Sequence, residues 1–247
     1  MTRLLVVTAV DAECDAVLDG LAGRATRLSW PSDPDGTPAG AGALPVDTAA
    51  VGADDRATVD VVAAGVGAVA AAAAVGMLAA VASAADRPYT AMVDLGIAGG
   101  FADRAGVGDT VIGTASIAAD LGADSPDGFL PLATLGFGIG ALDADPALVA
   151  RLRAGLPAAA AAPILSVSTV TGTAERAAEL RIRYPDAGAE AMEGFGVASV
   201  ARMCRVPFVE IRTVSNLVGP RDRAAWRIPD ALKALTEAAR AVGTLVG

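Results

Sequence analysis

Residues 91–100 read Ala-Met-Val-Asp-Leu-Gly-Ile-Ala-Gly-Gly, an apolar run that leads into a glycine-rich segment. The run at 91–95 has the composition of a buried central strand. The glycines predict a turn over residues 96–100, because backbone N–H groups can approach a ligand closely where side chains are missing. Since open α/β sheets gather their ligands at the carboxyl ends of strands, this segment is the first candidate for a functional site.

The segments on both sides of this run alternate in character. Apolar runs rich in Val and Ile are separated by longer Ala-, Leu- and Arg-rich segments, which is typical of strands alternating with helices around a largely parallel sheet. Further strands are expected at 4–8, 59–64, 107–117, 164–169, 187–192 and 207–215. Helices are expected at 11–18, 66–82, 145–155, 171–183, 194–205 and 229–245. We therefore predict an α/β three-layer sandwich with a central mixed, largely parallel β-sheet.

The length of 247 residues fits one domain with a full-sized core, which we place over residues 1–247. Residues 30–55 are dense in Pro, Gly and Asp. Such composition predicts loops and short antiparallel strands without a second hydrophobic core.

Charge and composition exclude several classes of function. Nineteen Lys and Arg against 28 Asp and Glu give a net charge of −9, which disfavours binding to nucleic acid or an anionic membrane surface. The chain has no His, so catalytic triads, imidazole acid–base chemistry and His-containing metal sites are excluded. Cys14 and Cys204 are too few for a zinc cluster or a disulfide framework, and we expect free buried thiols in a reducing compartment and no metal.

Two features of the sequence bear on the cellular location of the protein: its first residues and one long uncharged stretch. Residues 1–8 enter a strand directly, without the basic and hydrophobic regions of a signal peptide, so a cytoplasmic protein is expected. Residues 61–85 carry no charge and are long enough to cross a bilayer. Ala and Gly dominate this stretch and Asp60 and Asp86 flank it, so we predict a strand, a turn and a buried helix instead.

Acidic side chains follow two of the expected strands. Asp11 and Glu13 lie at the start of the first helix, where an acid also stabilises the helix dipole without any further function. Glu193 follows Met192, and its apolar neighbours suit either a functional site or a buried cap better than a solvated surface. General acid–base chemistry in a chain without His would depend on such carboxylates.

The segment after the strand at 207–215 gathers several chemically informative residues. Asn216 is the only side-chain amide in the sequence, although a turn residue before Gly219 is the alternative. Arg221, Arg223 and Trp226 follow, a combination suited to clamping a carboxylate and covering an aromatic ring. An ordinary solvated loop would have the same composition.

A rival motif occurs at residues 65–70, Gly-Val-Gly-Ala-Val-Ala, which fits the dinucleotide-binding fingerprint G-x-G-x-x-[GA]. Asp86 lies about twenty residues further on, as the ribose ligand of that fingerprint does. Asp86 precedes Arg87-Pro88 and does not close a second strand, so the ribose contact would be misplaced. An NAD-dependent oxidoreductase is kept as an alternative of a different class.

Two motifs carry a resemblance to a known family that spans nearly the whole chain. Residues 189–194 read Ala-Glu-Ala-Met-Glu-Gly, and residues 210–226 read Glu-Ile-Arg-Thr-Val-Ser-Asn-Leu-Val-Gly-Pro-Arg-Asp-Arg-Ala-Ala-Trp. Together with the glycine-rich residues 93–108, they resemble the nucleoside phosphorylase and nucleosidase superfamily, most closely its futalosine hydrolase branch. The resemblance implies a nucleoside phosphorylase-like fold.

The same resemblance implies roles for individual residues. Glu13 would activate the attacking water, Glu193 would hold the ribose hydroxyls with Met192 packed against the sugar, and Asn216 would contact the base. The remaining predicted substrate-binding residues are Ile97, Gly99, Val170, Phe195, Ser215, Arg221, Arg223 and Trp226. Of these, Phe195, Trp226 and one of the two arginines are the candidates for a slot that takes the 5′ carboxyphenyl group. Arg212 could instead be a structural partner of Glu190 or Glu210.

Asn216 stands where adenine-specific relatives carry an Asp, and this difference bears on the base. Hypoxanthine offers two acceptors, N7 and O6, which suit the two donors of an amide NH2. The implied activity is hydrolysis of futalosine to hypoxanthine and dehypoxanthine futalosine in menaquinone biosynthesis, by a homo-oligomer without metal or organic cofactor. Hydrolysis is favoured over phosphorolysis because Asp11 and Glu13 would repel phosphate. Nucleosidases for methylthioadenosine, S-adenosylhomocysteine or inosine, and a non-catalytic purine-binding module, are the alternatives.

Overall fold

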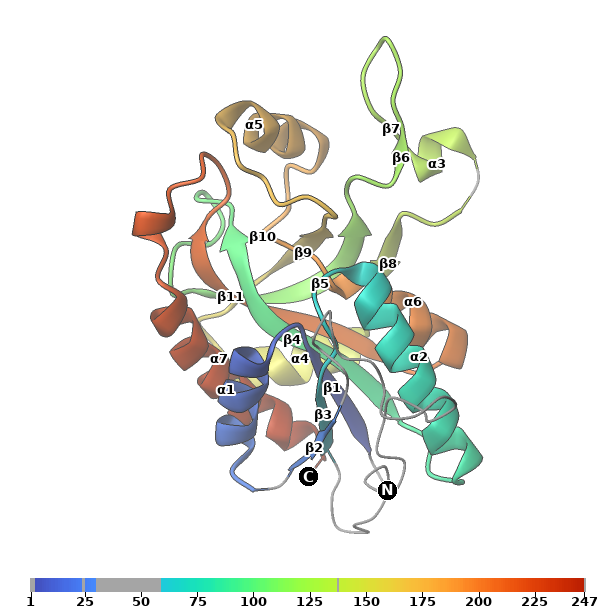
Figure 1. Cartoon of the computed structure of the whole chain (residues 1–247). Helices are drawn as coiled ribbons and strands as arrows, with labels where there is room; N and C mark the ends of the chain where they lie inside the picture. The colour runs from blue at the N-terminus through green and yellow to red at the C-terminus, as the bar shows by residue number, and fades with distance from the viewer. Residues whose placement is uncertain (1–2, 24, 30–58, 137, 247) are drawn as a thin grey trace.

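The computed structural model describes residues 3–23, 25–29, 59–136 and 138–246 (Figure 1). The loops and short strands expected at 30–55 lie outside the described residues. Most of the other expected helices and strands are present with shifted ends, because sequence patterns locate the middle of an element better than its ends.

Strands form one large mixed sheet, in the order β10-β9-β5-β11-β4-β1-β3-β2 with β8 on β5. The bounds are β1 Leu4–Thr8, β2 Ala25–Leu28, β3 Val59–Ala63, β4 Ala91–Gly100, β5 Thr110–Ala118, β8 Ala141–Asp143, β9 Ala160–Ser166, β10 Ala189–Ala191 and β11 Phe208–Leu217. Five neighbours (β2, β3, β1, β4 and β11) are parallel, whereas β5 is antiparallel to β11. β10 also pairs antiparallel with β4, so β4, β11, β5, β9 and β10 close into a ring.

Helices cover both faces of this sheet, which confirms the three-layer α/β architecture (Figure 1). The bounds are α1 Asp11–Leu21, α2 Ala68–Ala84, α3 Leu132–Leu135, α4 Pro146–Gly155, α5 Ala174–Arg183, α6 Gly194–Cys204 and α7 Ile228–Gly243. In β1, Leu4 and Val6 pack against the side covered by α1 and α7, while Leu5 and Val7 pack against α2 and α6. A strand buried on both faces is apolar at every position, which is why these strands are continuous hydrophobic runs in the sequence.

One uncharged stretch of the sequence, residues 61–85, contributes β3, a turn and α2. Among the described residues, none of the helices combines the length and the apolar character that crossing a membrane requires. Above the sheet in Figure 1, α5 and a short hairpin stand apart from the main layers. That hairpin pairs β6 (Gly122–Ala123) with β7 (Leu130–Pro131).

The turn expected at 96–100 is wrong, because β4 continues as a strand to Gly100. Its last residues pair with β11 on one side and with β10 on the other. The strand expected at 164–169 is likewise shifted, since β9 runs from 160 to 166. β2 and β8 were not expected; both are short strands at positions where pairing with a neighbour, and not a hydrophobic pattern, creates the strand.

Candidate active site

A cavity of about 340 Å³ lies where β1, β4 and β11 end. It lies at the carboxyl edge of the parallel strands, where α/β sheets bind their ligands. The cavity brings together most of the residues expected from the sequence: Glu13, Ile97, Gly99, Val170, Met192, Glu193, Ser215, Asn216, Arg221 and Trp226. A second cavity, of about 490 Å³, opens beside Arg202 and Phe208 and contains none of these residues.

Glu13 is 3% exposed and both of its carboxylate oxygens accept backbone hydrogen bonds. Oε2 accepts from the N–H groups of Ala9 (2.9 Å) and Val10 (3.2 Å), and Oε1 accepts from Ile97 N–H (2.8 Å). Burial raises the pKa of Glu13, while Arg212 and the backbone donors oppose that rise. The two interpretations of Glu13 from the sequence therefore coexist, because the side chain caps the first turn of α1 and also lines the cavity.

Glu193 lines the cavity, but the strand before it is not parallel to β4, although the sequence indicated a largely parallel sheet. It follows β10, which runs antiparallel to β4 with Glu190 opposite Gly99. The chain after β10 therefore turns back along β4 toward Glu13, and the closed ring of strands brings the two acids together. Glu193 is 4% exposed; Oε1 accepts from Gly67 N–H at 3.0 Å, and Oε2 lies 3.2 Å from Arg212 Nη2.

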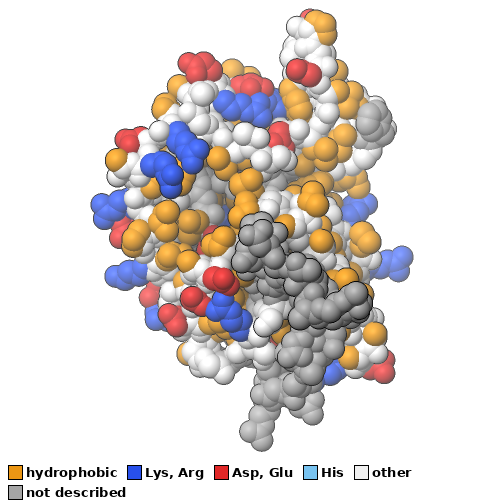
Figure 2. All heavy atoms as spheres, in the orientation of Figure 1, with side chains coloured by type: hydrophobic (Ala, Val, Ile, Leu, Met, Phe, Trp, Pro, Cys, Tyr) orange, Lys and Arg blue, Asp and Glu red, His pale blue; other side chains and the backbone are white. Residues whose placement is uncertain are grey.

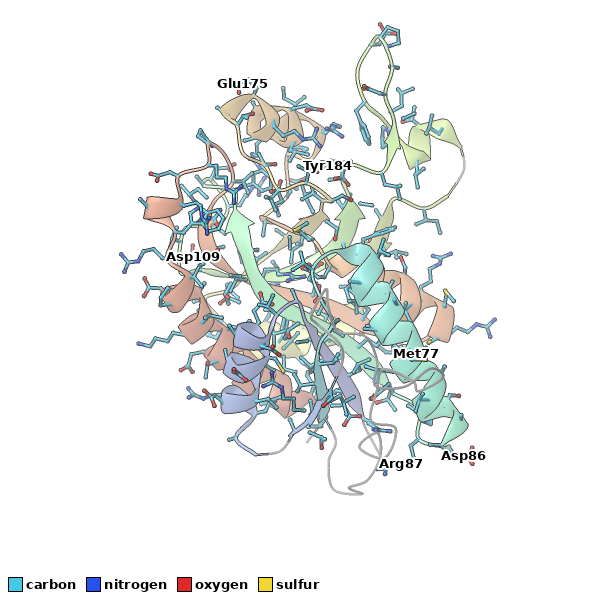
Figure 3. The ribbon with its side chains drawn as sticks, viewed as in Figure 1. Met77, Asp86, Arg87, Asp109, Glu175 and Tyr184 are labelled. Atoms are coloured by element: carbon cyan, nitrogen blue, oxygen red, sulfur yellow. The ribbon has the colours of Figure 1, made fainter. Side chains whose placement is uncertain are left out.

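The glycine-rich turn at 65–70 is thus already engaged by a carboxylate of the protein. Gly67 is the N-cap of α2, and its N–H points at Glu193 in the manner of an anion at a helix N-terminus. Asp86 lies at the opposite end of α2, as Figure 3 shows, in a turn that ends no strand. The two parts of the dinucleotide fingerprint are therefore separated by the length of a helix.

Arg212 is fully buried and forms the centre of an ion cluster that reaches the cavity at Glu193. Its guanidinium binds Asp94 and Glu193, and its Nε donates to Glu210 Oε1 at 2.9 Å. Burial raises the pKa values of Asp94 and Glu210. Burial opposes the charged form of Arg212, but the surrounding carboxylates raise its pKa above the ordinary value. The sequence left Glu190 and Glu210 open as partners of Arg212. In the structure Arg212 binds Glu210.

Asn216 is aimed by an irregularity in β11. The register between β11 and β4 shifts between Val214 and Asn216, which is the signature of a β-bulge, and bulges beside active sites redirect side chains. Ser215 Oγ donates to Asn216 Oδ1 at 2.8 Å, and Asn216 Nδ2 donates to Leu217 O at 3.1 Å. The amide oxygen is thereby fixed, and one N–H of the amide is left for a ligand in the cavity.

Of the four aromatic and cationic residues expected in the site, two line the cavity and two lie outside it. Trp226 and Arg221 line the cavity, with the Arg221 guanidinium 5.7 Å from the indole centroid. Arg223 lies 5.8 Å from the same ring but is not part of the lining. Phe195 also lies outside the cavity, because the first turn of α6 packs it against the core beneath α2, where its N–H donates to Ser166 Oγ at 2.8 Å.

Sequence reasoning missed Glu190 and Thr171 as parts of the site. Both line the cavity, and Glu190 accepts from Thr171 N–H at 2.7 Å and from the Thr171 hydroxyl. The available signal was an acid inside a short apolar strand, which only a partner or a ligand explains.

Comparisons with known proteins agree with this geometry. The family model of the Phosphorylase superfamily matches residues 16–246. A futalosine hydrolase of Streptomyces coelicolor is 47% identical over 241 residues, which cover 96% of this chain and 93% of the relative. A futalosine hydrolase of Acidothermus cellulolyticus is 45% identical over 245 residues, which cover 98% and 90% respectively.

Solved structures share the fold at lower identity. A 5'-methylthioadenosine/S-adenosylhomocysteine nucleosidase from Neisseria meningitidis, in complex with methylthio-immucillin-A, has a TM-score of 0.72 at 19% identity and covers 100% of this chain and 99% of its own. The native futalosine hydrolase of Helicobacter pylori strain 26695 has a TM-score of 0.72 at 16% identity, with 99% and 97% coverage. These likenesses show the nucleoside phosphorylase-like fold.

Proposed function

Because the chain belongs to the futalosine hydrolase family within the phosphorylase superfamily, we propose that it hydrolyses the N-glycosidic bond of futalosine. The products would be hypoxanthine and dehypoxanthine futalosine, which places the reaction in menaquinone biosynthesis. One observation carries the proposal: the buried carboxylates of Glu13 and Glu193 and the only side-chain amide of the sequence, Asn216, line the same cavity.

In the proposed mechanism, Glu13 acts as the general base. As the bond to the base weakens, the ribose gains oxocarbenium character, and the Glu13 carboxylate takes a proton from the attacking water. Backbone donors from Ala9 and Ile97 fix the carboxylate, so little reorganisation is needed when water reacts. General-base assistance of this kind contributes typically ~10²- to 10⁴-fold.

Glu193 and Asn216 act on the two fragments that separate. Glu193, fixed by Gly67 N–H and Arg212, would accept hydrogen bonds from the ribose hydroxyls, and these bonds strengthen as the sugar becomes cationic. The N–H of Asn216 that does not bind Leu217 O would donate to the departing 6-oxopurine and stabilise the negative charge that develops on it. Met192 lines the cavity beside Glu193, where it would pack against the sugar.

The charges around the cavity favour water over phosphate as the nucleophile. Among the described residues that line it, Glu13, Glu190 and Glu193 are acidic and Arg221 is basic. A phosphate dianion beside the sugar would face carboxylates, whose repulsion is strong in a site of low dielectric. On the face shown in Figure 2, Lys and Arg side chains are interspersed with acidic ones.

Arg221 and Trp226 are the proposed contacts of the 5′ carboxyphenyl group. Both line the cavity, and their stacked arrangement joins an aromatic surface to a cation. Phe195 and Arg223 are not proposed for this role, since neither lines the cavity.

The two cysteines and two exposed apolar side chains bear on the location and the assembly of the protein. Cys14 is a buried free thiol as expected, whereas the free thiol of Cys204 is exposed, because it lies at the end of α6. Free thiols suit the reducing cytoplasm. Val66, just before the N-cap of α2, and Val69, in its first turn, are 56% and 86% exposed although apolar. A second copy of the chain would cover such side chains, so we propose a homo-oligomer whose subunit is a single domain.

The experiment that tests the function measures hypoxanthine or adenine release by the purified protein from futalosine, inosine and methylthioadenosine, each with and without phosphate. We expect fast release from futalosine that phosphate does not accelerate. Preference for methylthioadenosine would contradict the role of Asn216, and a ribose-1-phosphate-type product would contradict hydrolysis.

The matched variant is Glu13→Gln, which keeps the size of the side chain and removes the base. We expect ~10²- to 10⁴-fold lower turnover with an unchanged circular dichroism spectrum. Turnover near that of the wild type would remove Glu13 from the mechanism.

A further inference from the structure

Asp94 and Glu210 are fully buried carboxylates that the mechanism above does not use. The strand register pairs Glu210 of β11 with Asp94 of β4, and residues paired in this way project from the same face of a sheet. The register also pairs Arg212 with Gly96, so the guanidinium lies beside both acids on that face. Two acids therefore stand about one strand spacing apart, ~4.8 Å between their backbones, inside the protein.

Arg212 binds one oxygen of each acid. Its Nη2 donates to Asp94 Oδ2, and its Nε donates to Glu210 Oε1 at 2.9 Å. The other two oxygens, Asp94 Oδ1 and Glu210 Oε2, are buried and receive no hydrogen bond from the part of the chain that the structure describes. A buried charged oxygen without a donor is costly, and a proton on one of these two oxygens removes that cost.

Among the described residues, four carboxylates surround one cation in this cluster. Besides the pair, Arg212 faces Glu193, whose Oε2 lies 3.2 Å from Nη2. Glu13 is the fourth acid, since a Cβ at Gly96 would lie 2.5 Å from Arg212 Nη1 and 2.9 Å from Glu13 Oε1. If all four acids were ionised, about three negative charges would remain unbalanced in a buried cluster, and proteins avoid this state by protonation.

Backbone hydrogen bonds indicate which acids of the cluster hold the proton. Glu13 accepts three backbone N–H groups and Glu193 accepts two, and such bonds favour the charged form of a carboxylate. Within the described ranges, neither Asp94 nor Glu210 accepts one. Burial raises the pKa of Asp94 well above its ordinary value, and repulsion from Glu210 adds to that rise against the pull of Arg212.

We propose that Asp94 and Glu210 hold one proton between them and act as positioning residues for Glu13 and Glu193. A pair with one proton keeps one negative charge, which balances Arg212 and fixes its guanidinium through Nε and Nη2. Arg212 is then aimed at Glu193 and, because its charge is balanced, lowers the pKa of Glu13 less, so that Glu13 stays the stronger base. The proposal rests on the proposed role of Glu13.

Substitution by amides tests the charge of the pair. In Asp94→Asn and in Glu210→Gln, the NH2 group replaces the shared proton and the remaining acid ionises, so the pair keeps its single negative charge. The decline of kcat/KM at low pH should therefore keep its midpoint in each single variant. The double variant removes the last charge of the pair. Arg212 then lowers the pKa of Glu13, and the midpoint should move to lower pH by about one unit.

The two other charge states of the pair give different patterns. If both acids are ionised, each single variant should move the midpoint to lower pH, and the double variant should move it further. If both acids are protonated, even the double variant should leave the midpoint in place. Either pattern would overturn the proposal.

Asp60→Asn is the matched control. Asp60 is another buried acid, 2% exposed, and it binds Arg3 at 2.6 Å, but it lies near the amino end of β3 and does not line the cavity. The substitution breaks a buried ion pair and should lower the free energy of unfolding without moving the midpoint. A shift like that of the double variant would show that lost stability alone moves the profile, and would overturn the proposal.

Carbon-13 NMR of labelled aspartate carboxyls tests the proton without catalysis and without a variant that has to fold. At neutral pH, one aspartate carboxyl of the wild type should have a chemical shift outside the ionised range. This signal should be absent from Asp94→Asn and should move to the ionised value in Glu210→Gln. Ionised shifts for every aspartate of the wild type would overturn the proposal, whether or not futalosine is cleaved. The expected signals without cleavage of futalosine would refute the proposed function alone.

Discussion

Two glycine-rich segments, one in the turn after β3 and one within β4, use glycine for different physical reasons. In the turn between β3 and α2, Gly65 and Gly67 have φ angles of 92° and 97°, which L-residues rarely adopt. Along β4, Gly96 lies in an ordinary extended strand. A Cβ at Gly96 would stand 2.5 Å from Arg212 Nη1 and 2.9 Å from Glu13 Oε1, so this glycine provides space.

Each segment places one acid of the site. Gly67 provides the N–H that fixes Glu193, whereas the β4 segment leaves room for Glu13 and fixes it through Ile97 N–H. One segment depends on a backbone conformation and the other on an empty volume. Substitutions to alanine separate these cases, because a single methyl group strains the first through φ and the second through contact.

Gly96→Ala should have the largest effect. The methyl group would displace Glu13 and Arg212, and overpacking of a buried site costs about 1–3 kcal/mol. We expect turnover to fall at least ~10²-fold, as expected when the general base is misplaced. In the double variant with Glu13→Gln, the two losses should not add, because both act on one group. Additive losses would show that Gly96 acts elsewhere.

Gly67→Ala should have a smaller effect, confined to the other acid. The φ of 97° and ψ of 155° lie in a region essentially restricted to glycine, where an L-residue costs about 1–3 kcal/mol. Thermal unfolding should show this loss of stability. Kinetics should show a higher KM, since Glu193 loses part of its support. A normal KM and melting temperature would mean that the turn adapts without cost.

The pH profile reports on the acid that β4 positions. Burial raises the pKa of Glu13, and the base must be ionised to accept a proton from water. Activity should therefore fall as pH decreases through that raised pKa, and kcat/KM should decline at a pH above the ordinary value of 4.5. The residual activity of Glu13→Gln should lack this decline. A profile that is flat down to pH 4.5 would contradict the assignment.

Gly76→Ala is the control. It should stabilise the protein where the other two substitutions destabilise it, and its effect should be the smallest. Gly76 lies within α2 at an ordinary φ, and a Cβ there would meet no atom within 4 Å. Alanine should raise the free energy of unfolding by about 0.5–1 kcal/mol and leave activity unchanged. Chemical denaturation measures this change, and a destabilised variant would undermine the distinction between these kinds of glycine.

Local chemistry made much of the site predictable from the sequence. Acids after apolar strands, a unique amide and an indole beside arginines are conspicuous in any chain, and the cavity is lined by Glu13, Glu193, Asn216 and Trp226. Phe195 and Arg223 had the same appearance but lie outside the cavity, because the face of α6 and the course of a loop are tertiary properties. Glu190 was overlooked since its importance depends on the strand that pairs beside it.

The sequence alone determined the alternation of strands and helices, the layered architecture and the chemical classes available to the site, because these follow from composition and local periodicity. Only the tertiary structure decided that β4 extends through its glycines, that β10 closes a ring by pairing antiparallel with β4, and that Glu190 and Asn216 flank Gly99. Strand direction and register arise from contacts between residues far apart in the chain, and a local pattern carries no record of them.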